Sequence, residues 1–218
     1  MDKIKEKALI IPVDTQKHIL SGLKMAGQVI LSGRVVAFPT ESFYGLAVNA
    51  TNDEAIQSLI ILKERQGDHP ILILIPSEDV LEQYVTHIPE IARRLIKEFW
   101  PGGMTIIFEA GKSVSPLLTA GTGKIGVRVS SHPIATGLAR AAGVPISGTS
   151  ANITGRPACV NSRDVFRSLG RKVDLILDGG ETKGGEGSTI IDITVHPPVM
   201  VREGIVSRDR LKGYLTRS

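Results

Sequence analysis

The feature that most constrains the fold is the repeated appearance of short apolar runs rich in β-branched residues. Turn residues or longer segments with apolar residues at helical spacing separate these runs. Such alternation favours a layered α/β architecture. The β-rich runs are Ala8–Ile11, Arg34–Phe38, Ile71–Ile75, Thr105–Phe108, Gly126–Val129, Val144–Ile146, Leu175–Leu177, Thr189–Ile193 and Met200–Arg202.

Four of the intervening segments predict helices, because each combines helical spacing with a start or stop signal. Two of the β-rich runs, 105–108 and 126–129, follow each other without a predicted helix between them, so a purely parallel sheet is disfavoured. The sequence therefore predicts one α/β domain with a mixed parallel and antiparallel sheet and flanking helices. The predicted helices are Thr15–Ser32, Asn52–Lys63, Glu90–Phe99 and Pro133–Gly143.

Composition narrows the class of protein. Aromatic residues make up only 4% of the 218 residues, which disfavours a stacking platform for single-stranded nucleic acid. The formal net charge of +4 is mild, and the single cysteine, Cys159, excludes a disulfide framework and a cysteine-rich zinc site. No stretch approaches the roughly 20 apolar residues of a membrane span, and the N-terminal apolar run is too short for a secretory signal. We expect a cytoplasmic protein without membrane contact.

Two familiar signatures are rejected on their context. Gly121–Gly126 matches the dinucleotide pattern G-x-G-x-x-G, but a β-rich run follows it where that fingerprint requires a helix. Gly148–Asn152 approaches the nucleophile elbow of hydrolases, but Asn152 stands where the tight turn needs glycine. The five histidines have no metal-ligand spacing, so no metal site is predicted from the protein's own residues.

Four polar islands, far apart in the sequence, share one chemistry. They are rich in cations, hydroxyls and amides, which offset phosphate charge and orient phosphate oxygens. Taken singly, each island also reads as a helix end, a turn or the start of a strand. Their combination favours a pocket for ATP or a similar anion. The islands are Pro39–Ser42, Lys63–Arg65, Ile146–Pro157, and Ser188–Thr189 with Arg202; Lys124 and Thr149 supply a further cation and hydroxyl.

Seven motifs in order and spacing make the chain resemble the YrdC/Sua5 family over residues 15 to 205. Relative to the usual family pattern, Leu74 replaces a frequent His, Gln66 replaces Pro, Gly103 replaces the second Pro of Pro-Gly-Pro, and Ser42 replaces Thr. The motifs are Pro39–Leu46, Lys63–Arg65, Pro101–Thr105, Gly126–Val129, Ser150–Gly155, Ser188–Asp192 and Val201–Gly204.

The resemblance implies a twisted mixed sheet around a concave, positively charged cavity, and an L-threonylcarbamoyladenylate synthase, a nucleotidyltransferase. Such an enzyme joins L-threonine, bicarbonate and ATP, the last with Mg²⁺, and releases pyrophosphate. Its product feeds the tRNA threonylcarbamoyl-transfer machinery that forms N6-threonylcarbamoyladenosine at position 37. The resemblance also implies one domain over residues 1–218, with a short basic tail over 206–218, and allows contact with tRNA or double-stranded RNA.

Site residues carried over from the family fall into three groups. The catalytic set is Lys63, Arg65, Ser150 and Asn152. The L-threonine set is Thr40, Ser42, Arg128 and Ser188. The ATP set is Arg65, His69, Lys124, Ser150 and Arg202.

Three alternatives to this function stay open at this point. The first is a non-catalytic module that holds nucleotide or double-stranded RNA in the same cavity. The second is a carbamoyl-transfer enzyme of the hydrogenase-maturation type, which the lone Cys159 disfavours, and the third is a plain structural domain. The glycine-rich segment 179–187 is expected to be a loop, and its composition suggests a lid over the site.

Overall fold

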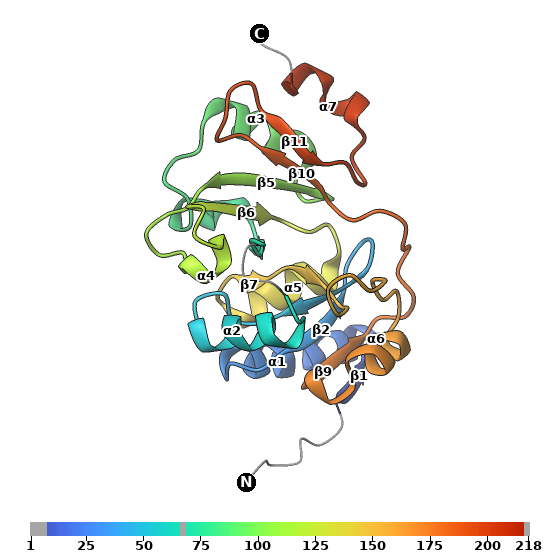
Figure 1. Ribbon diagram of the computed structural model, residues 1–218. Coiled ribbons are helices and arrows are strands. Elements are labelled where there is room, and N and C mark those ends of the chain that lie inside the picture. Colours follow the sequence, from blue (N-terminus) through green and yellow to red (C-terminus); the bar gives the residue numbers. More distant parts are fainter. Residues whose placement is uncertain (1–7, 66–68, 216–218) are drawn as a thin grey trace.

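The computed structural model describes residues 8–65 and 69–215, and over these residues the strands form two sheets (Figure 1). Sheet A, the lower one in Figure 1, holds five strands and sheet B, the upper one, holds six. Both sheets mix parallel and antiparallel pairs. In order across sheet A the strands are β1 (Leu9–Pro12), β9 (Leu175–Asp178), β2 (Val36–Pro39), β3 (Tyr44–Ala47) and β8 (Thr149–Ser150). In sheet B they are β11 (Val199–Arg202), β10 (Thr189–Asp192), β5 (Met104–Glu109), β6 (Lys124–Arg128), β4 (Ile73–Leu74) and β7 (Ile146–Ser147).

The two sheets meet where β3 continues toward β7. An isolated antiparallel bridge pairs Asn49 with Ile146, and the Ser147 N–H donates to the carbonyl of Val48. Only Gly148 lies between β7 of sheet B and β8 of sheet A. The chain therefore passes from one sheet to the other within a few residues, and the sheets enclose an angle that the site occupies.

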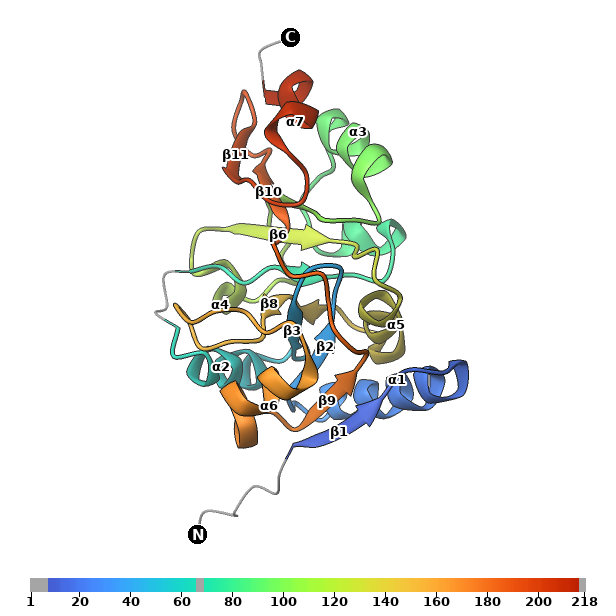
Figure 2. The same ribbon diagram turned by 90° about the vertical axis from the view of Figure 1, so that its right-hand side faces the viewer.

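Helices α1 (Gln16–Leu31) and α5 (Pro133–Ala142) pack against each other beneath sheet A. Gly27 allows the close approach, because a Cβ there would lie 2.7 Å from the carbonyl oxygen of Ala141. The other helices cover the rest of sheet A and the outer end of sheet B (Figure 2). They are α2 (Asp53–Leu62), α3 (Glu90–Phe99), α4 (Pro116–Thr119), α6 (Ser162–Leu169) and α7 (Arg208–Leu215), with 3₁₀ turns η1 (Glu78–Gln83) and η2 (Gly170–Lys172).

The helix ends follow the capping signals in the sequence. Thr15 accepts a hydrogen bond from the His18 N–H at the start of α1, and Asn52 accepts one from Ala55 at the start of α2. Gly143 ends α5 in the left-handed conformation, with φ of 66°. These contacts fix where the chain leaves each helix and enters the next strand.

The mixed α/β prediction is confirmed. Each of the nine β-rich runs overlaps a strand, and each of the four predicted helices is present within two residues of its expected ends. The strands are divided between two sheets instead of one, because the chain bends at Gly148. Strands β3 and β8 and helices α4 and α6 were not predicted.

The apolar interior has two clusters, one on each side of sheet A. The larger lies between sheet A, α2 and sheet B, and reaches up to α3 and α7. The smaller lies between sheet A and the α1–α5 pair. The inner strands β2 and β3 of sheet A are consequently covered on both faces and buried along their whole length.

Segment 179–188 crosses from β9 of sheet A to β10 of sheet B, and it has no helix or strand of its own (Figure 2). On the sheet A side, the Tyr44 hydroxyl accepts from the Gly179 N–H and donates to the carbonyl of Gly180. Farther along, the Gly184 N–H donates to the carbonyl of Ser42. The expected loop is confirmed, and these contacts make it a strap between the sheets; a role as a lid stays a prediction.

The basic C-terminal segment forms helix α7 against α3. Leu211 is fully buried, and the Tyr214 ring meets Phe99 edge to face with centroids 6.1 Å apart. Arg210 lies over the Phe99 ring and Arg94 over the Tyr214 ring. Residues 208–215 are therefore a packed helix whose charged groups face outward. Across residues 8–65 and 69–215, no helix is both long and apolar enough to cross a membrane.

Candidate functional site

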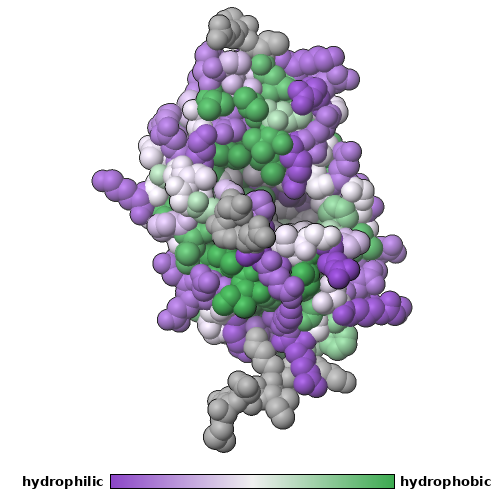
Figure 3. All heavy atoms as spheres, in the orientation of Figure 1, coloured by the Kyte–Doolittle hydropathy of each residue, from purple (hydrophilic) through white to green (hydrophobic). Residues whose placement is uncertain are grey.

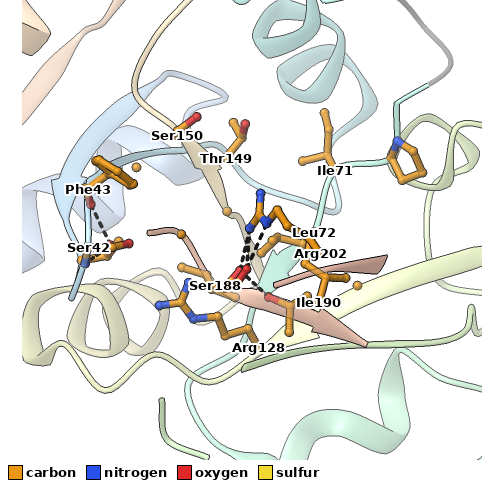
Figure 4. Close-up of a pocket in the computed structure, with 18 of the residues that line it drawn as sticks. Ser42, Phe43, Ile71, Leu72, Arg128, Thr149, Ser150, Ser188, Ile190 and Arg202 are labelled. Carbon is orange, nitrogen blue, oxygen red and sulfur yellow. Dashed lines mark hydrogen bonds between the residues drawn. The ribbon is translucent and has the colours of Figure 1, made fainter. Parts of the chain in front are cut away.

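A cavity of about 670 Å³ lies in the angle between the two sheets. Figure 3 shows the corresponding face hollowed between its two halves, and Figure 4 shows side chains from both sheets pointing into the hollow. Its walls combine charged and hydroxyl groups with apolar residues such as Leu72, Ile107 and Ile190. A cavity of this size and mixed lining is typical of a small-molecule site.

Arg128, at the end of β6, is a buried guanidinium in the sheet B wall. Its Nε donates to the carbonyl of Gly102 at 2.9 Å, and its Nη2 forms an ion pair with Glu41. Glu41 also accepts from the Ser130 hydroxyl at 2.7 Å. Burial raises the pKa of Glu41, but the charge of Arg128 and this hydrogen bond outweigh burial and hold the pKa below its usual value. Glu41 stays ionised and fixes Arg128 from behind.

Arg202 and Ser188 form a second cluster in the same wall (Figure 4). The Arg202 guanidinium donates to the carbonyl of Ser188 through Nε at 3.0 Å and Nη2 at 2.7 Å, and to the Ser188 hydroxyl at 3.1 Å. The buried Thr105 hydroxyl lies 2.9 Å from the same Ser188 oxygen. Desolvation, and then the charge of Arg128, lowers the pKa of Arg202, so the two guanidinium groups of this wall repel each other.

Two further cations lie at the edges of the cavity. Lys124, at the start of β6, pairs with Asp192 of β10 at 2.9 Å. Arg65 follows α2 and donates to the backbone carbonyls of His69 and Pro70 at 3.1 and 2.8 Å. The cavity thus has cationic groups at its rim from sheet B and from the segment that follows α2.

The sheet A wall is built around Lys63, the C-cap of α2. Its ammonium donates to the carbonyls of Ser150 and Asn152 at 2.6 and 2.8 Å, and to Asn152 Oδ1 at 3.1 Å. The Ser150 hydroxyl donates to Asn152 Oδ1 at 2.5 Å. Burial, and then the charge of Arg65, lowers the pKa of Lys63 to about 8. Lys63 is 2% exposed and lies behind Ser150, outside the cavity lining.

The turn between β2 and β3 forms one side of the site. The Thr40 hydroxyl donates to the carbonyl of Phe43 at 2.7 Å and accepts from the Ser42 N–H at 3.3 Å. This closes a tight loop that presents Ser42 and Phe43 at the cavity (Figure 4). Beneath it lies Tyr44, whose burial raises the pKa of its hydroxyl to about 12, so the hydroxyl remains protonated.

The structure brings most of the sequence-derived candidates into this one hollow. Lys63 and Asn152 lie one layer behind its surface, where they hold Ser150. His69 is exposed and outside the lining, although its backbone carbonyl accepts from Arg65. The candidates that line the cavity are Thr40, Ser42, Arg65, Lys124, Arg128, Ser150, Ser188 and Arg202.

Sequence reasoning missed the partners that hold these side chains. Glu41 was inside a polar island, and a lone carboxylate among cations was a usable signal. Thr105 and Tyr44 gave no such signal, because threonine and tyrosine are ordinary strand residues. Leu74, at the position where the family often has His, lies in β4, is 3% exposed and lines the cavity. Gln66 lies outside the described residues.

The described residues contain no group of three or more His, Cys, Asp or Glu side chains placed to hold a metal ion. Among the described lining residues Asp192 is the one carboxylate, and Lys124 already pairs with it. The part of the chain that the structure describes therefore offers no site for an ion bound wholly by protein ligands. A Mg²⁺ ion that arrives on a triphosphate needs only one or two protein carboxylates, and Asp192 fits that requirement.

The sequence of this chain matches a known family and several curated proteins. Residues 28–204 match the family model named for Sua5, YciO and YrdC and described as telomere recombination. The chain belongs to the Sua5/YciO/YrdC family. It is 39% identical over 182 residues to a threonylcarbamoyl-AMP synthase of Pyrococcus abyssi, a match that covers 84% of this chain and 54% of that protein. A putative threonylcarbamoyl-AMP synthase of Mycobacterium tuberculosis is 34% identical over 194 residues, with 89% of each chain covered.

The fold agrees with the family assignment. The crystal structure of P. abyssi Sua5 complexed with L-threonine superposes with a TM-score of 0.91 at 36% identity, covering 95% of this chain and 61% of that one. The chain thus spans about half the length of the first curated relatives it matches, at 54% and 56% of theirs.

Proposed function

We propose that this protein is an L-threonylcarbamoyladenylate synthase that consumes L-threonine, bicarbonate and ATP and releases pyrophosphate. The observation that carries the proposal is the convergence of Arg65, Lys124, Arg128 and Arg202 with three serine hydroxyls on one cavity of about 670 Å³. Relatives bearing the name threonylcarbamoyl-AMP synthase, and a Sua5 structure holding L-threonine, support the same reaction. In this proposal the product is used to form N6-threonylcarbamoyladenosine in tRNA.

The chemistry explains why cations and hydroxyls dominate the site. The threonine amine and bicarbonate condense to an N-carboxylate with loss of water. A carboxylate oxygen then attacks the α-phosphorus of ATP, the bond to the β-phosphate oxygen breaks, and pyrophosphate leaves. Two anions must be held together despite their repulsion, so positioning and charge stabilisation provide the catalysis, and no protein nucleophile is required.

Each wall has a place in this scheme. Arg128, held by Glu41, and Ser188 are the groups for the amino-acid carboxylate, together with Ser42 and Thr40 of the adjacent turn. Arg65, Lys124 and Arg202 neutralise the triphosphate. When Mg²⁺ is bound to the triphosphate it offsets charge on the leaving pyrophosphate, and Asp192 is the residue that would approach it.

The test is pyrophosphate release by the purified full chain with ATP, Mg²⁺, bicarbonate and each amino acid in turn. We expect release only when bicarbonate and L-threonine are both present. Ser188→Ala should raise the KM for L-threonine, whereas Ser162→Ala, which removes a buried hydroxyl outside the cavity, should not. ATP binding without pyrophosphate release under any combination would instead identify a non-catalytic nucleotide-binding module.

A further inference from the structure

The direction of the Ser150 hydroxyl is fixed by groups behind it. Its proton is donated to Asn152 Oδ1 at 2.5 Å. The orientation of the Asn152 amide is fixed independently, because its Nδ2 donates to the carbonyl of Arg156 and its Oδ1 accepts from the Lys63 ammonium. An ammonium group can only donate, so the oxygen of the amide must be the atom that faces Lys63 and Ser150.

Lys63 has no proton left for a ligand. An ammonium group has three N–H bonds, and three acceptors surround this one: the carbonyls of Ser150 and Asn152, and Asn152 Oδ1. The side chain is 2% exposed. Lys63 and Asn152 therefore act on a ligand through Ser150 and are positioning residues.

We infer that Ser150 acts toward the bound ligand as a hydrogen-bond acceptor, with its polarity set by Asn152 and Lys63. A serine hydroxyl has one proton and two lone pairs, and only the lone pairs remain available to the cavity. The ligand atom that meets Ser150 must consequently carry a hydrogen. A ribose hydroxyl, the amino group of adenine or the hydroxyl of the amino acid meets this condition, and an ionised phosphate oxygen does not.

Ser188 on the opposite sheet has the reverse polarity. It accepts from the Arg202 guanidinium, which can only donate, and Ser188 is the partner that the structure gives the buried Thr105 hydroxyl. With both lone pairs occupied, its proton points to the ligand. The cavity therefore orients its contents, with an acceptor such as a carboxylate toward sheet B and a donor toward sheet A. This orientation rests on the proposed function for the identity of the ligands.

The test compares ligands that each lack one donor, measured by isothermal titration calorimetry. The nucleotides are ATP, 2′-deoxyATP, 3′-deoxyATP and purine riboside triphosphate, and L-2-aminobutyrate is compared with L-threonine. With the unmodified protein, one of the ligands that lacks a donor should bind about tenfold more weakly than its parent, ATP or L-threonine, because one hydrogen bond is missing. On Ser150→Ala that same loss should cost less than about twofold, because the acceptor is gone. Ser162→Ala is the control and should keep the full penalty.

The inference is overturned if Ser150→Ala leaves every one of these affinity ratios unchanged. It is also overturned if Ser150→Ala weakens all nucleotides equally, including those lacking a donor, because Ser150 would then bind a shared phosphate group. Affinity is measured without turnover, so the two proposals fail separately. If Ser150→Ala removes the penalty for the missing donor but no pyrophosphate is released, only the proposed function fails. If pyrophosphate is released but the penalty persists in Ser150→Ala, only the inference fails.

Discussion

The two walls of the cavity use cations in different ways. In the sheet A wall, Lys63 at the end of α2 is buried behind the surface, and its three protons go to the backbone and side chain of the 150–152 turn. In sheet B, Arg128 and Lys124 lie on the surface of the cavity, and Glu41 and Asp192 respectively hold them. The same type of charge thus shapes the backbone in one wall and faces the ligand in the other. Depth, which the sequence does not state, decides between these roles.

Lys63→Ala tests the role of the buried cation in the sheet A wall most directly. Three acceptors would lose a charged donor, and we expect the free energy of unfolding to fall by about 2 to 4 kcal/mol. Pyrophosphate release should fall by about 100-fold, since the 150–152 turn loses its support. Urea unfolding and the release assay measure the two effects. Lys172→Ala removes an exposed lysine paired with Glu64 and should cost less than about 1 kcal/mol. A stable and active Lys63→Ala would contradict the role given to sheet A.

The matching change in sheet B is Arg202→Lys. Lysine cannot reproduce the two parallel donors that Arg202 offers to the Ser188 carbonyl, so Ser188 should lose its position. We expect the KM for L-threonine to rise about 10- to 30-fold, and the free energy of unfolding to fall by less than about 1 kcal/mol. Arg208→Lys on the outer surface is the control. If Arg202→Lys instead lowers the free energy of unfolding strongly and leaves KM unchanged in the folded variant, the sheet B wall has a structural role like that of the sheet A wall.

Thr105→Val tests the sheet B wall more finely, because it removes one hydroxyl at nearly constant volume. Losing this donor to Ser188 should raise the KM for L-threonine about three- to tenfold with kcat almost unchanged. Thr105→Ser should restore it, and Thr119→Val, a buried threonine outside the cavity lining, should have no effect. In a Ser188→Ala background, Thr105→Val should add nothing to KM. A further rise there would mean that Thr105 contacts the ligand directly.

The smallest effect is expected from pH. The pKa of Lys63 falls from 10.5 to about 8 on folding. Above pH 8 its ammonium therefore deprotonates in the folded protein while the unfolded chain keeps its proton. The unfolded state then binds more protons, so this group adds stability as pH rises from about 8 to 10.5. It also loses one donor to the 150–152 turn, and affinity for ATP should weaken about two- to fivefold between pH 7 and 9.

Calorimetry at several pH values, with melting temperatures in parallel, distinguishes this local effect from unfolding. Nitrogen NMR of the Lys63 ammonium should show a midpoint near pH 8. A midpoint near 10 would mean that the ammonium is not desolvated as the structure indicates.

The elements that the sequence predicted well are those with a local signal. Thr15, Asn52 and Pro133 mark helix starts, and the β-rich runs are long enough to stand out. Helix α6 also had a signal that was missed, since Asn161 caps it and Val165 and Leu169 lie on one face. The resemblance to the family supplied eight candidate side chains that line one cavity in the structure.

The elements that were not predictable depend on distant contacts. β8 has two residues and exists because Gly45 pairs with Ser150, about a hundred positions away in the chain. The division into two sheets depends on Gly148, where the chain leaves β7 of sheet B and enters β8 of sheet A, and the distant bridge between Asn49 and Ile146 joins the two sheets there. Lys63 was expected to contact substrate, and only its depth shows that its protons go to the protein. Sequence patterns give residue types, whereas packing decides which atoms face the ligand.

The strap between the sheets also limits how far the two walls of the cavity can separate. Gly184 is tied to Ser42 on one wall, and Ser188 is tied to Arg202 on the other, so four residues form the tether between these anchors. Fully extended, such a tether reaches about 13 to 14 Å. While both anchors hold, the walls cannot part far enough at this edge to admit a nucleic-acid duplex. An RNA duplex that approached this edge would therefore stay at the rim of the cavity.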